Sequence, residues 1–325
     1  MPRVSVIMAA YNAAPYIGAA VGCLVAQTLG DWELIVADDG STDDTAAIVE
    51  SLATRDGRIR LLRLPHTGSP YAVRRRAVQE AAGQWIFPFD ADDLLDADFL
   101  ARLVGRADRC PDAEMILCAL HVFSGEDAAD ARQDVPVPGV DAGRVYTCRE
   151  LLPLTLGQWQ IAGNGLFDGA LFRRGIALTE PYADNPFADE LLLRVMLTCG
   201  SRAVIEPARY LYRMQAGSVT HRISYSRYRN MQTDMAMYRL LPDELHPALH
   251  RHLYNGIVCA LLRLGREGWP ADCTRRELDA LLRQAYDCLD FDSLAGSVSG
   301  PVFRIMRLGY RPARAVLTAY GRLKG

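Results

Sequence analysis

Residues 85–95 read Trp85-Ile86-Phe87-Pro88-Phe89-Asp90-Ala91-Asp92-Asp93-Leu94-Leu95. An apolar run of this length is typical of a buried strand, and here it ends directly in three carboxylates. Side chains two positions apart in extended backbone point the same way, so Asp90 and Asp92 are expected to share one side of the chain. Because ligands bind at the carboxyl ends of strands in open α/β sheets, this run predicts a ligand site.

Paired carboxylates at such an edge favour a metal ion. Two acids held together repel unless a proton or a cation lies between them. Hard oxygen ligands suit Mg²⁺ or Mn²⁺, and these ions complete their coordination with phosphate oxygens. The alternative is structural, since Asp93 can cap a helix that continues through Leu94.

The composition is that of an ordinary globular protein. The chain has 325 residues, of which 50% are hydrophobic, and a net charge of −3. This length accommodates one large or two modest domains, and the charge gives no indication of nucleic-acid binding. No apolar run approaches the ~20 residues that a membrane span needs. The first residues lead straight into a predicted strand without a signal peptide, so we expect a cytoplasmic protein.

Strands and helices are predicted to alternate in the first hundred residues. Apolar runs predict strands over residues 4–9, 32–37, 59–64 and 85–89. Helical spacing predicts helices over 15–27, from a cap at Ser41 or Thr42 to about 55, and over 70–82. Four such units imply a mainly parallel sheet with right-handed crossovers. Residues 124–145 lack apolar periodicity and are predicted to be a surface excursion.

Three segments carry a family resemblance, namely Val4-Ser5-Val6-Ile7-Met8-Ala9-Ala10-Tyr11-Asn12, Gln27-Thr28 and Trp32-Glu33-Leu34-Ile35-Val36-Ala37-Asp38-Asp39-Gly40-Ser41-Thr42-Asp43. In this order and spacing they resemble the opening of family 2 glycosyltransferases, and Asp90-Ala91-Asp92-Asp93 matches that family's metal-binding Asp-x-Asp. The resemblance is convincing over residues 1–110, visible over 160–220 and absent beyond about 230. It implies an α/β GT-A fold, Rossmann-like and mainly parallel, with a helical C-terminal extension.

The resemblance also implies a division of the chain. We expect residues 1–112 to form the nucleotide-sugar-binding half of the GT-A domain and 113–225 the acceptor-binding half. Residues 226–325 are expected to form a helical region. Within the first half, Tyr11 is implied to stack on the donor base and Asp39 to accept from its ring N–H, with Asp38 and Ala9 beside them. Ordinary packing of Tyr11 and bracing of the turn by Asp38 are the structural alternatives.

Arg74 stands where the family commonly has an arginine near the donor diphosphate. A guanidinium suits phosphate because its fork donates in one plane and keeps its charge. The alternative is that Arg74 belongs to a solvated helix face. Asp92 is implied to bind the metal, and Asp90, with Ala91 beside it, the ribose or the water shell of the ion.

Asp189-Glu190, at the head of a predicted helix, matches an acidic pair from which the family draws its catalytic base. An inverting transfer needs one base opposite the leaving group. Asp189 is favoured and Glu190 is the alternative, while an acidic first turn that complements the helix dipole is the structural explanation. In the segment 210–221, Arg213 and His221 are implied phosphate or metal contacts. A surface histidine is the alternative for His221.

Helices are predicted over residues 227–241, 247–265 and 274–289, with a tail from 302. The tail holds six Lys or Arg residues, and no acid follows Asp292. Its interleaved apolar residues are Phe303, Ile305, Met306, Leu308, Val316 and Leu317. Such a basic amphipathic element fits an anionic membrane surface, which would make the protein peripheral on the inner membrane face. Packing on the catalytic domain or on a partner subunit is the equal alternative, and a homodimer is left open.

The function expected from these features is an inverting, Mn²⁺- or Mg²⁺-dependent glycosyltransferase. It would move a sugar from a nucleotide-diphosphate donor, most simply a UDP-sugar, to a hydroxyl of a glycan or lipid-linked saccharide. The alternatives are a nucleotidyltransferase acting on sugar phosphates and a catalytically degenerate donor-binding subunit. Nucleotidyl transfer normally uses a glycine-rich loop with a lysine near the first strand, and residues 9–14 contain neither.

Overall fold

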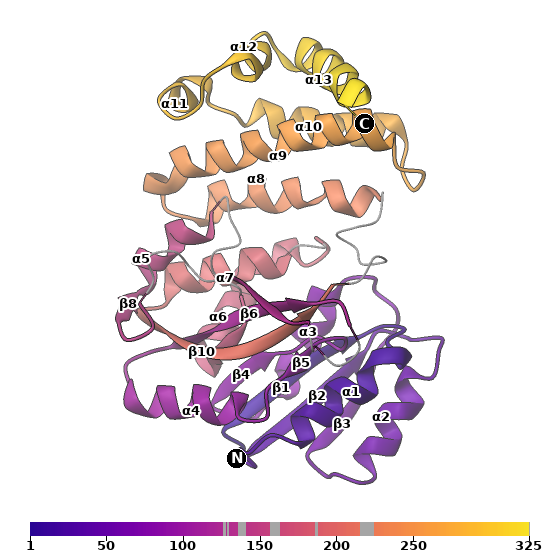
Figure 1. The fold of residues 1–325 in the computed structure, drawn as a ribbon, viewed down its shortest axis with the longest axis vertical. Coiled ribbons are helices and arrows are strands. Elements are labelled where there is room, and N and C mark those ends of the chain that lie inside the picture. Colours follow the sequence, from indigo (N-terminus) through magenta and orange to yellow (C-terminus); the bar gives the residue numbers. More distant parts are fainter. Residues whose placement is uncertain are drawn as a thin grey trace. The chain divides into compact units, whose positions relative to one another are not determined.

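The computed structural model describes residues 1–125, 128, 130–135, 141–156, 163–185, 188–214 and 224–324. The chain forms two compact units. The first is Met1–Asp184 with Ala188–Gln215, and the second is Asn185–Phe187 with Ala216–Gly325. In the part that the structure describes, all strands belong to the first unit, and the second is built from helices (Figure 1). The boundaries expected after residues 112 and 225 stay predictions.

The described strands of the first unit form one ten-stranded sheet. Its order is β3-β2-β1-β4-β9-β6-β10-β5, with β7 paired to β6 and β8 to β10. The strands are β1 (Val4–Ala10), β2 (Trp32–Asp38), β3 (Ile59–Arg63), β4 (Trp85–Pro88), β5 (Leu94–Leu95), β6 (Met115–Phe123), β7 (Arg132–Val135), β8 (Val145–Thr147), β9 (Gly165–Asp168) and β10 (Arg202–Arg213). Strands β1 to β4 pair in parallel, so their carboxyl ends meet at one edge of the sheet.

Helices cover both faces of this sheet. They are α1 (Ala14–Val25), α2 (Thr45–Ala53), α3 (Pro70–Glu80), α4 (Phe99–Arg109), α5 (Cys148–Leu151), α6 (Gly169–Thr179) and α7 (Ala188–Cys199), with short 3-10 helices at Leu152–Thr155 and Glu180–Tyr182. One core joins α1, α2 and α4 to alternate residues of β1 such as Val4, Val6 and Met8. Because side chains alternate along a strand, α3, which also contacts β1, packs on the other face. The predicted alternation of strands and helices is therefore confirmed.

Two local expectations were wrong. Helix α2 begins at Thr45 after Asp44, not at Ser41 or Thr42. The reason is that the Ser41 hydroxyl donates to Asp38, and the Thr42 N–H donates to Asn12 Oδ1 at 2.8 Å, so both stay in the turn. The expected surface excursion over 124–145 contains β7, which pairs antiparallel with β6 and extends the sheet.

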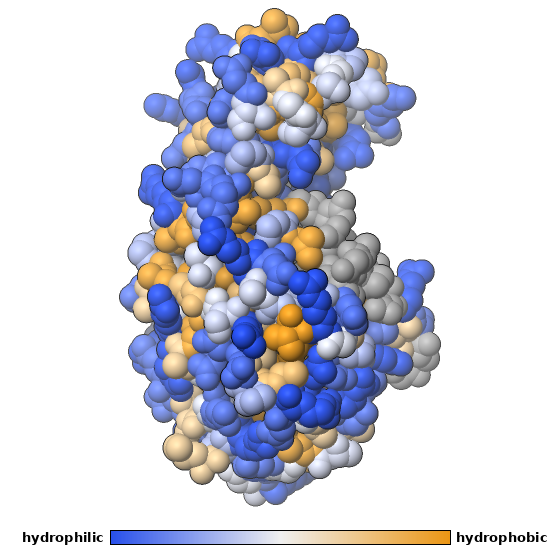
Figure 2. All heavy atoms as spheres, turned by 90° about the vertical axis from the view of Figure 1, so that its left-hand side faces the viewer, coloured by the Kyte–Doolittle hydropathy of each residue, from blue (hydrophilic) through white to orange (hydrophobic). Residues whose placement is uncertain are grey.

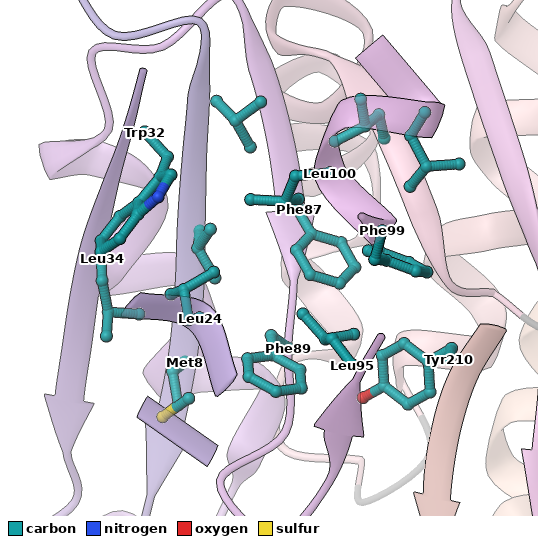
Figure 3. Packing of buried hydrophobic residues seen from close by; sticks show 14 of the residues in the cluster. Met8, Leu24, Trp32, Leu34, Phe87, Phe89, Leu95, Phe99, Leu100 and Tyr210 are labelled. Atoms are coloured by element: carbon teal, nitrogen blue, oxygen red, sulfur yellow. The ribbon is translucent and has the colours of Figure 1, made fainter. Parts of the chain in front are cut away.

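An aromatic group holds the end of β4 against β10. The rings of Phe87 and Phe89 lie 5.8 Å apart, and Tyr210 meets Phe89 edge-on at 5.9 Å (Figure 3). Phe99 from α4 closes the group at 5.3 Å from Phe87. Buried aromatic pairs each contribute ~0.5–1.5 kcal/mol beyond the burial of their area. The strand that ends in three acids is thus anchored immediately before them.

The second unit has its own core. Its elements are α8 (Asn230–Leu240), α9 (His246–Glu267), α10 (Arg275–Asp287), α11 (Phe291–Ala295), α12 (Pro301–Arg307) and α13 (Tyr310–Lys324), with 3-10 helices at Tyr225–Tyr228 and Asp243–Leu245. Helix α10 starts at a capping box of Thr274 and Glu277. The expected tail is broken into α12 and α13 at Gly309, whose φ is +114°. None of the described helices is long and apolar enough to span a bilayer.

Hydrophilic side chains predominate on the face of the molecule seen in Figure 2, where hydrophobic ones form small groups. Such scattered groups are normal on globular surfaces and indicate no special function by themselves.

Candidate active site

Residues 90–93, which we call the acidic turn, follow β4 and lie at the edge of the sheet where β1 and β2 also end. Phe89 is fully buried, and its N–H donates to the Ile7 carbonyl at 3.0 Å, which extends the pairing of β4 with β1. The turn closes when the Asp93 N–H donates to the Asp90 carbonyl at 3.3 Å. The structure therefore brings three carboxylates together within one turn, not in the extended backbone that was expected to align Asp90 with Asp92. It does not place Asp93 as a helix cap, because the strand β5 follows.

Strand β10 holds this turn from the opposite side. The Tyr210 hydroxyl donates to Asp93 at 2.6 Å and accepts from the Asp90 N–H at 3.3 Å. The Arg213 N–H donates to Asp93 at 2.8 Å, and its Nε donates to the Asp92 carbonyl at 2.8 Å. The Asp93 carboxylate is fully buried and accepts two of these hydrogen bonds from β10, while Asp90 and Asp92 remain partly exposed.

Two acids of the turn, Asp92 and Asp93, are in surroundings that disfavour their ionised forms. Burial, reinforced by the neighbouring Asp90 charge, raises the pKa of Asp92 to about 6. Burial and the charges of Asp90 and Asp92 raise the pKa of Asp93 well above its usual range. In both shifts burial is the largest cause, and repulsion from the neighbouring carboxylates adds to it. A cation bound between the carboxylates would relieve this repulsion.

Arg74 joins the acidic turn to the head of α7. It lies one turn into α3, which starts at Pro70 and is capped by Ser69, whose hydroxyl accepts from the Ala72 N–H at 3.2 Å. Its guanidinium contacts Asp90, and its Nη1 lies 3.8 Å from Asp189 Oδ2. Although burial opposes it, the two carboxylates raise the pKa of Arg74. Arg74 therefore pairs with acids on two different elements.

The two acids at the start of α7 have different surroundings. Asp189 faces Arg74, and about half of its side chain is exposed. The protein atoms packed around it still withdraw it from bulk water and raise its pKa, while Arg74 acts in the opposite direction. Glu190 pairs with Arg194 at 3.1 Å, and Arg194 also donates to the Thr155 carbonyl at 2.7 Å. Asp189 thus belongs to the group around the acidic turn, whereas Glu190 takes part in an ion pair within α7.

A second group of side chains lies at the ends of β1, β2 and β3. The ring of Tyr11 stacks on His66 with centroids 4.2 Å apart, and 47% of Tyr11 remains exposed. The Asp39 carboxylate is almost fully buried and accepts from the N–H groups of Thr67 at 2.7 Å and Gly68 at 2.9 Å. The Thr67 hydroxyl also donates to Asp39 at 2.9 Å, and His66 Nδ1 lies 3.0 Å from Asp39 Oδ2. A carboxylate has about four acceptor positions, so three are taken by Thr67 and Gly68 and the fourth faces His66.

The other residues that the sequence predicted for the site differ in their burial and in their contacts. Asp38 is buried and accepts from Ser41, which is the bracing geometry weighed as its alternative. Ala9 is partly buried at the end of β1, and Ala91 is buried within the acidic turn. Arg213 is buried, donates to Gly125 at 2.5 Å as well as to Asp92, and lies over the ring of Phe123. The predicted contact His221 lies outside the described residues.

Tyr210 and His66 are the site residues that sequence reasoning did not select. His66 follows β3, and the rule that ligands bind at the carboxyl ends of parallel strands could have included it. Tyr210 lies 117 residues from Asp93 along the chain and pairs with it through the sheet order. No local pattern indicates such a partner.

Comparisons with known proteins place this geometry in context. A family model described as glycosyl transferase family 2 matches residues 5–174. The succinoglycan biosynthesis protein ExoO of Rhizobium meliloti is 30% identical over 239 residues, which cover 68% of this chain and 63% of that protein. EpsJ of Bacillus subtilis, described as an uncharacterized glycosyltransferase, is 32% identical over 151 residues, 46% of this chain and 42% of EpsJ. The chain thus spans less than two thirds of these relatives.

Two solved structures share the fold. Residues 1–349 of Staphylococcus aureus TarS, in complex with UDP, align over 100% of this chain and 92% of that one, with a TM-score of 0.69 and 18% identity. The mannosyltransferase PcManGT from Pyrobaculum calidifontis, in complex with GDP-Man and Mn²⁺, covers 98% of this chain and 85% of that one, with a TM-score of 0.51 and 20% identity. At these identities the likeness concerns the fold alone.

Proposed function

This chain belongs to glycosyl transferase family 2, and we propose that it transfers a sugar from a nucleotide-diphosphate donor to a hydroxyl of a glycan or lipid-linked saccharide. The family match confirms the predicted family and enzyme class, and the likeness to solved structures confirms the predicted GT-A fold with a helical C-terminal region. The observation that carries the proposal is the group formed by the acidic turn, Arg74 and Asp189 at the carboxyl edge of the sheet.

The donor is proposed to be a UDP-sugar. A planar ring has two faces, and because His66 covers one face of Tyr11, the exposed remainder is available to a base. The acceptor position of Asp39 Oδ2 that faces His66 would suit the imino proton of uracil. Two TarS structures are complexes with UDP and with UDP-GlcNAc, and the PcManGT structure is a complex with GDP-Man, which supports a nucleotide sugar as the donor class.

A divalent cation fits the acidic turn. The described residues contain no group of three His, Cys, Asp or Glu that could hold a metal by themselves. Mg²⁺ and Mn²⁺, however, commonly use one or two carboxylates and take their other ligands from phosphates and water. Asp92 and Asp90 would supply the carboxylates, and their crowding supports this assignment. When bound, the ion would stabilise the negative charge of the leaving diphosphate.

Asp189 is proposed to be the base of an inverting transfer. Its half-exposed carboxylate can reach an acceptor hydroxyl, while Arg74 keeps it next to the acidic turn. Its raised pKa makes it a better proton acceptor than an ordinary aspartate. Glu190 is less suited because Arg194 already neutralises it. The acceptor would approach this side of the site with its hydroxyl toward Asp189.

The acceptor is proposed from the relatives. ExoO is named as a succinoglycan biosynthesis protein, which supports a role in polysaccharide or glycoconjugate biosynthesis. The individual sugar and the linkage depend on loops that do not match the family. The homodimer, and a place of action in the cytoplasm or at the inner membrane face, stay predictions.

A thermal-shift screen tests the donor and the metal together. Nucleotides and nucleotide sugars would be added to the full chain with and without Mn²⁺, because a ligand that binds only the folded state raises the melting temperature. We expect UDP or a UDP-sugar to give the largest shift, and only when Mn²⁺ is present. If another nucleotide gave the largest shift in melting temperature, the assignment of UDP as the donor nucleotide would be overturned. If UDP gave an equal shift in EDTA, the proposed need for a metal would be overturned.

Product analysis with the donor so identified separates the reaction classes. Release of UDP with a lengthened saccharide is the expected result. Release of pyrophosphate would indicate nucleotidyl transfer, and donor binding without turnover of any offered acceptor would indicate a degenerate subunit.

A further inference from the structure

Helix α13 of the second unit is fixed to α9 by one of its faces. Its buried residues are Tyr310, Ala313, Leu317 and Gly321. At Gly321 the two helices approach so closely that a Cβ would lie 2.2 Å from the Leu262 carbonyl oxygen. A Cβ on Gly265 of α9 would in turn lie 2.9 Å from the Gly321 Cα. This close crossing sets the rotation of α13 about its axis, and therefore which side chains face outward.

The outward side of α13 carries a second set of apolar residues. Val316, Tyr320 and Leu323 are 46%, 51% and 85% exposed. Their spacing of four and three residues places them along one stripe of the helix. We call these three residues the apolar stripe. Helix α13 already packs on the core through its buried residues. The core therefore does not need the exposed apolar residues of the stripe.

The structure corrects which tail residues can contact a membrane. Phe303, Met306 and Leu317 were expected to form part of a basic amphipathic surface, but all three are buried in the core of the second unit. They pack there because α12 and α13 fold back onto α9. Leu308 and Val316, which the tail pattern selected, are exposed, and so are Tyr320 and Leu323, which it did not select.

Unpaired positive charge is carried by α12 and α13, the helix with the apolar stripe. Residues 293–325 contain six Lys or Arg and no Asp or Glu. Arg307 pairs with Asp292 and Arg314 with Asp279. The other four are exposed and form no ion pair within the described part of the chain: Arg304, Arg311, Arg322 and Lys324. At about 100° per residue, Lys324 lies about 75° from the middle of the stripe on one side, whereas Arg322 and Arg311 lie about 125° and 145° from it on the other side.

We propose that α13 binds the surface of a membrane that contains anionic lipids. The apolar stripe would enter the headgroup region, and Lys324 and Arg322, which lie on its two sides, would contact lipid phosphates. The charge distribution favours this occupant over a second copy of the chain. In a twofold dimer the same patch meets itself, so like charges would face one another with no acid to compensate. The proposal does not depend on the catalytic chemistry of the first unit.

Vesicle flotation of the full chain tests this surface. We expect binding to phosphatidylcholine vesicles that contain phosphatidylglycerol, little binding to phosphatidylcholine alone, and release at high salt. Each cation near an anionic surface strengthens binding about fivefold, so Arg322→Gln and Lys324→Gln together should weaken it roughly 25-fold. Val316→Ser, Tyr320→Ser and Leu323→Ser together should weaken binding without removing its salt dependence.

A matched control separates α13 from the general charge of the unit. Arg251→Gln with Arg276→Gln removes exposed cations from α9 and α10 and should leave vesicle binding nearly unchanged. Circular dichroism and melting temperature would show that every variant is folded. The proposal is overturned if the wild type does not float with anionic vesicles, or if the control loses as much binding as the α13 variants. A wild-type dimer that the stripe variant dissociates would equally overturn it, in favour of a second copy.

Discussion

The Tyr210 hydroxyl joins the two ends of the acidic turn, because it donates to Asp93 at 2.6 Å and accepts from the Asp90 N–H at 3.3 Å. Its ring is fixed edge-on against Phe89, so the hydroxyl cannot move without disturbing the core (Figure 3). Tyr210 therefore positions the turn from β10 without being a proposed ligand itself. Residues that support a site in this way hold the ligand-contacting residues in the geometry that binding requires.

Tyr210→Phe should lower both stability and metal-dependent binding. The change leaves the buried Asp93 carboxylate short of a donor, which costs about 1–3 kcal/mol of unfolding free energy. The loosened turn should also weaken Mn²⁺-dependent UDP binding. Urea unfolding and titration calorimetry measure the two effects. Tyr71→Phe is the matched control, because the buried Tyr71 hydroxyl contacts Thr179 away from the turn. Equal loss of UDP binding in both variants would contradict the positioning role.

Asp92→Asn should separate stability from function. It removes one of the crowded negative charges, so we expect a melting temperature in EDTA that is unchanged or higher than that of the wild type. The increase in melting temperature on adding Mn²⁺ with UDP should disappear. Asp98→Asn, an exposed aspartate that makes no cap hydrogen bond, is the control and should keep the ligand response. Near-normal Mn²⁺-dependent UDP binding by Asp92→Asn would remove this residue from the metal site.

Much of the first unit could be predicted because its determinants are local. The apolar run at residues 4–10 is buried along nearly its whole length, as parallel strands require, and acids or turns follow at the expected edge. The partners of those acids could not be predicted. Arg74 lies 16 residues from Asp90 and Tyr210 lies 120 from it, and only the fold brings them together.

The tail shows a different limit of sequence patterns. Helical spacing identified its apolar and basic residues, but it could not say which of two apolar faces packs inward. That choice depends on the close approach of Gly265 and Gly321, which is a property of the helix pair. A single amphipathic pattern was therefore expected where the structure has a buried face and a separate exposed stripe.

Asp189→Asn should stop transfer while UDP still binds. Removing a general base commonly lowers turnover by ~10²–10⁴-fold. Glu190→Gln breaks the pair with Arg194 and should cost some stability, with turnover largely kept. Turnover is measured as UDP release in the presence of acceptor, and affinity by calorimetry. If a folded Glu190→Gln variant loses turnover and Asp189→Asn does not, the roles of the two acids are reversed.

Arg74→Gln should lower transfer more than it lowers UDP affinity. Without the guanidinium, Asp90 and Asp189 would face each other without the cation that separates them, and the base would lose its position. We expect kcat/KM to fall by at least ~100-fold and Arg74→Lys to restore part of it, because lysine keeps the charge but not the fork. Arg76→Gln, on the exposed side of α3, should have no effect. A parallel loss of UDP affinity would instead support the predicted contact with the diphosphate.

Gly165→Ala should prevent stable folding of the first unit. Gly165 begins β9 with a φ of +151°, and a Cβ there would lie 2.2 Å from the Ile116 carbonyl oxygen of β6. Neither neighbour can move, because β9 pairs with both β4 and β6 in the middle of the sheet. We expect a loss of about 3 kcal/mol or more in unfolding free energy, or insoluble protein. Gly163→Ala is the control, since its Cβ would meet Leu193 at an ordinary 3.5 Å. Soluble Gly165→Ala protein with wild-type stability would show that β9 does not approach β6 as described.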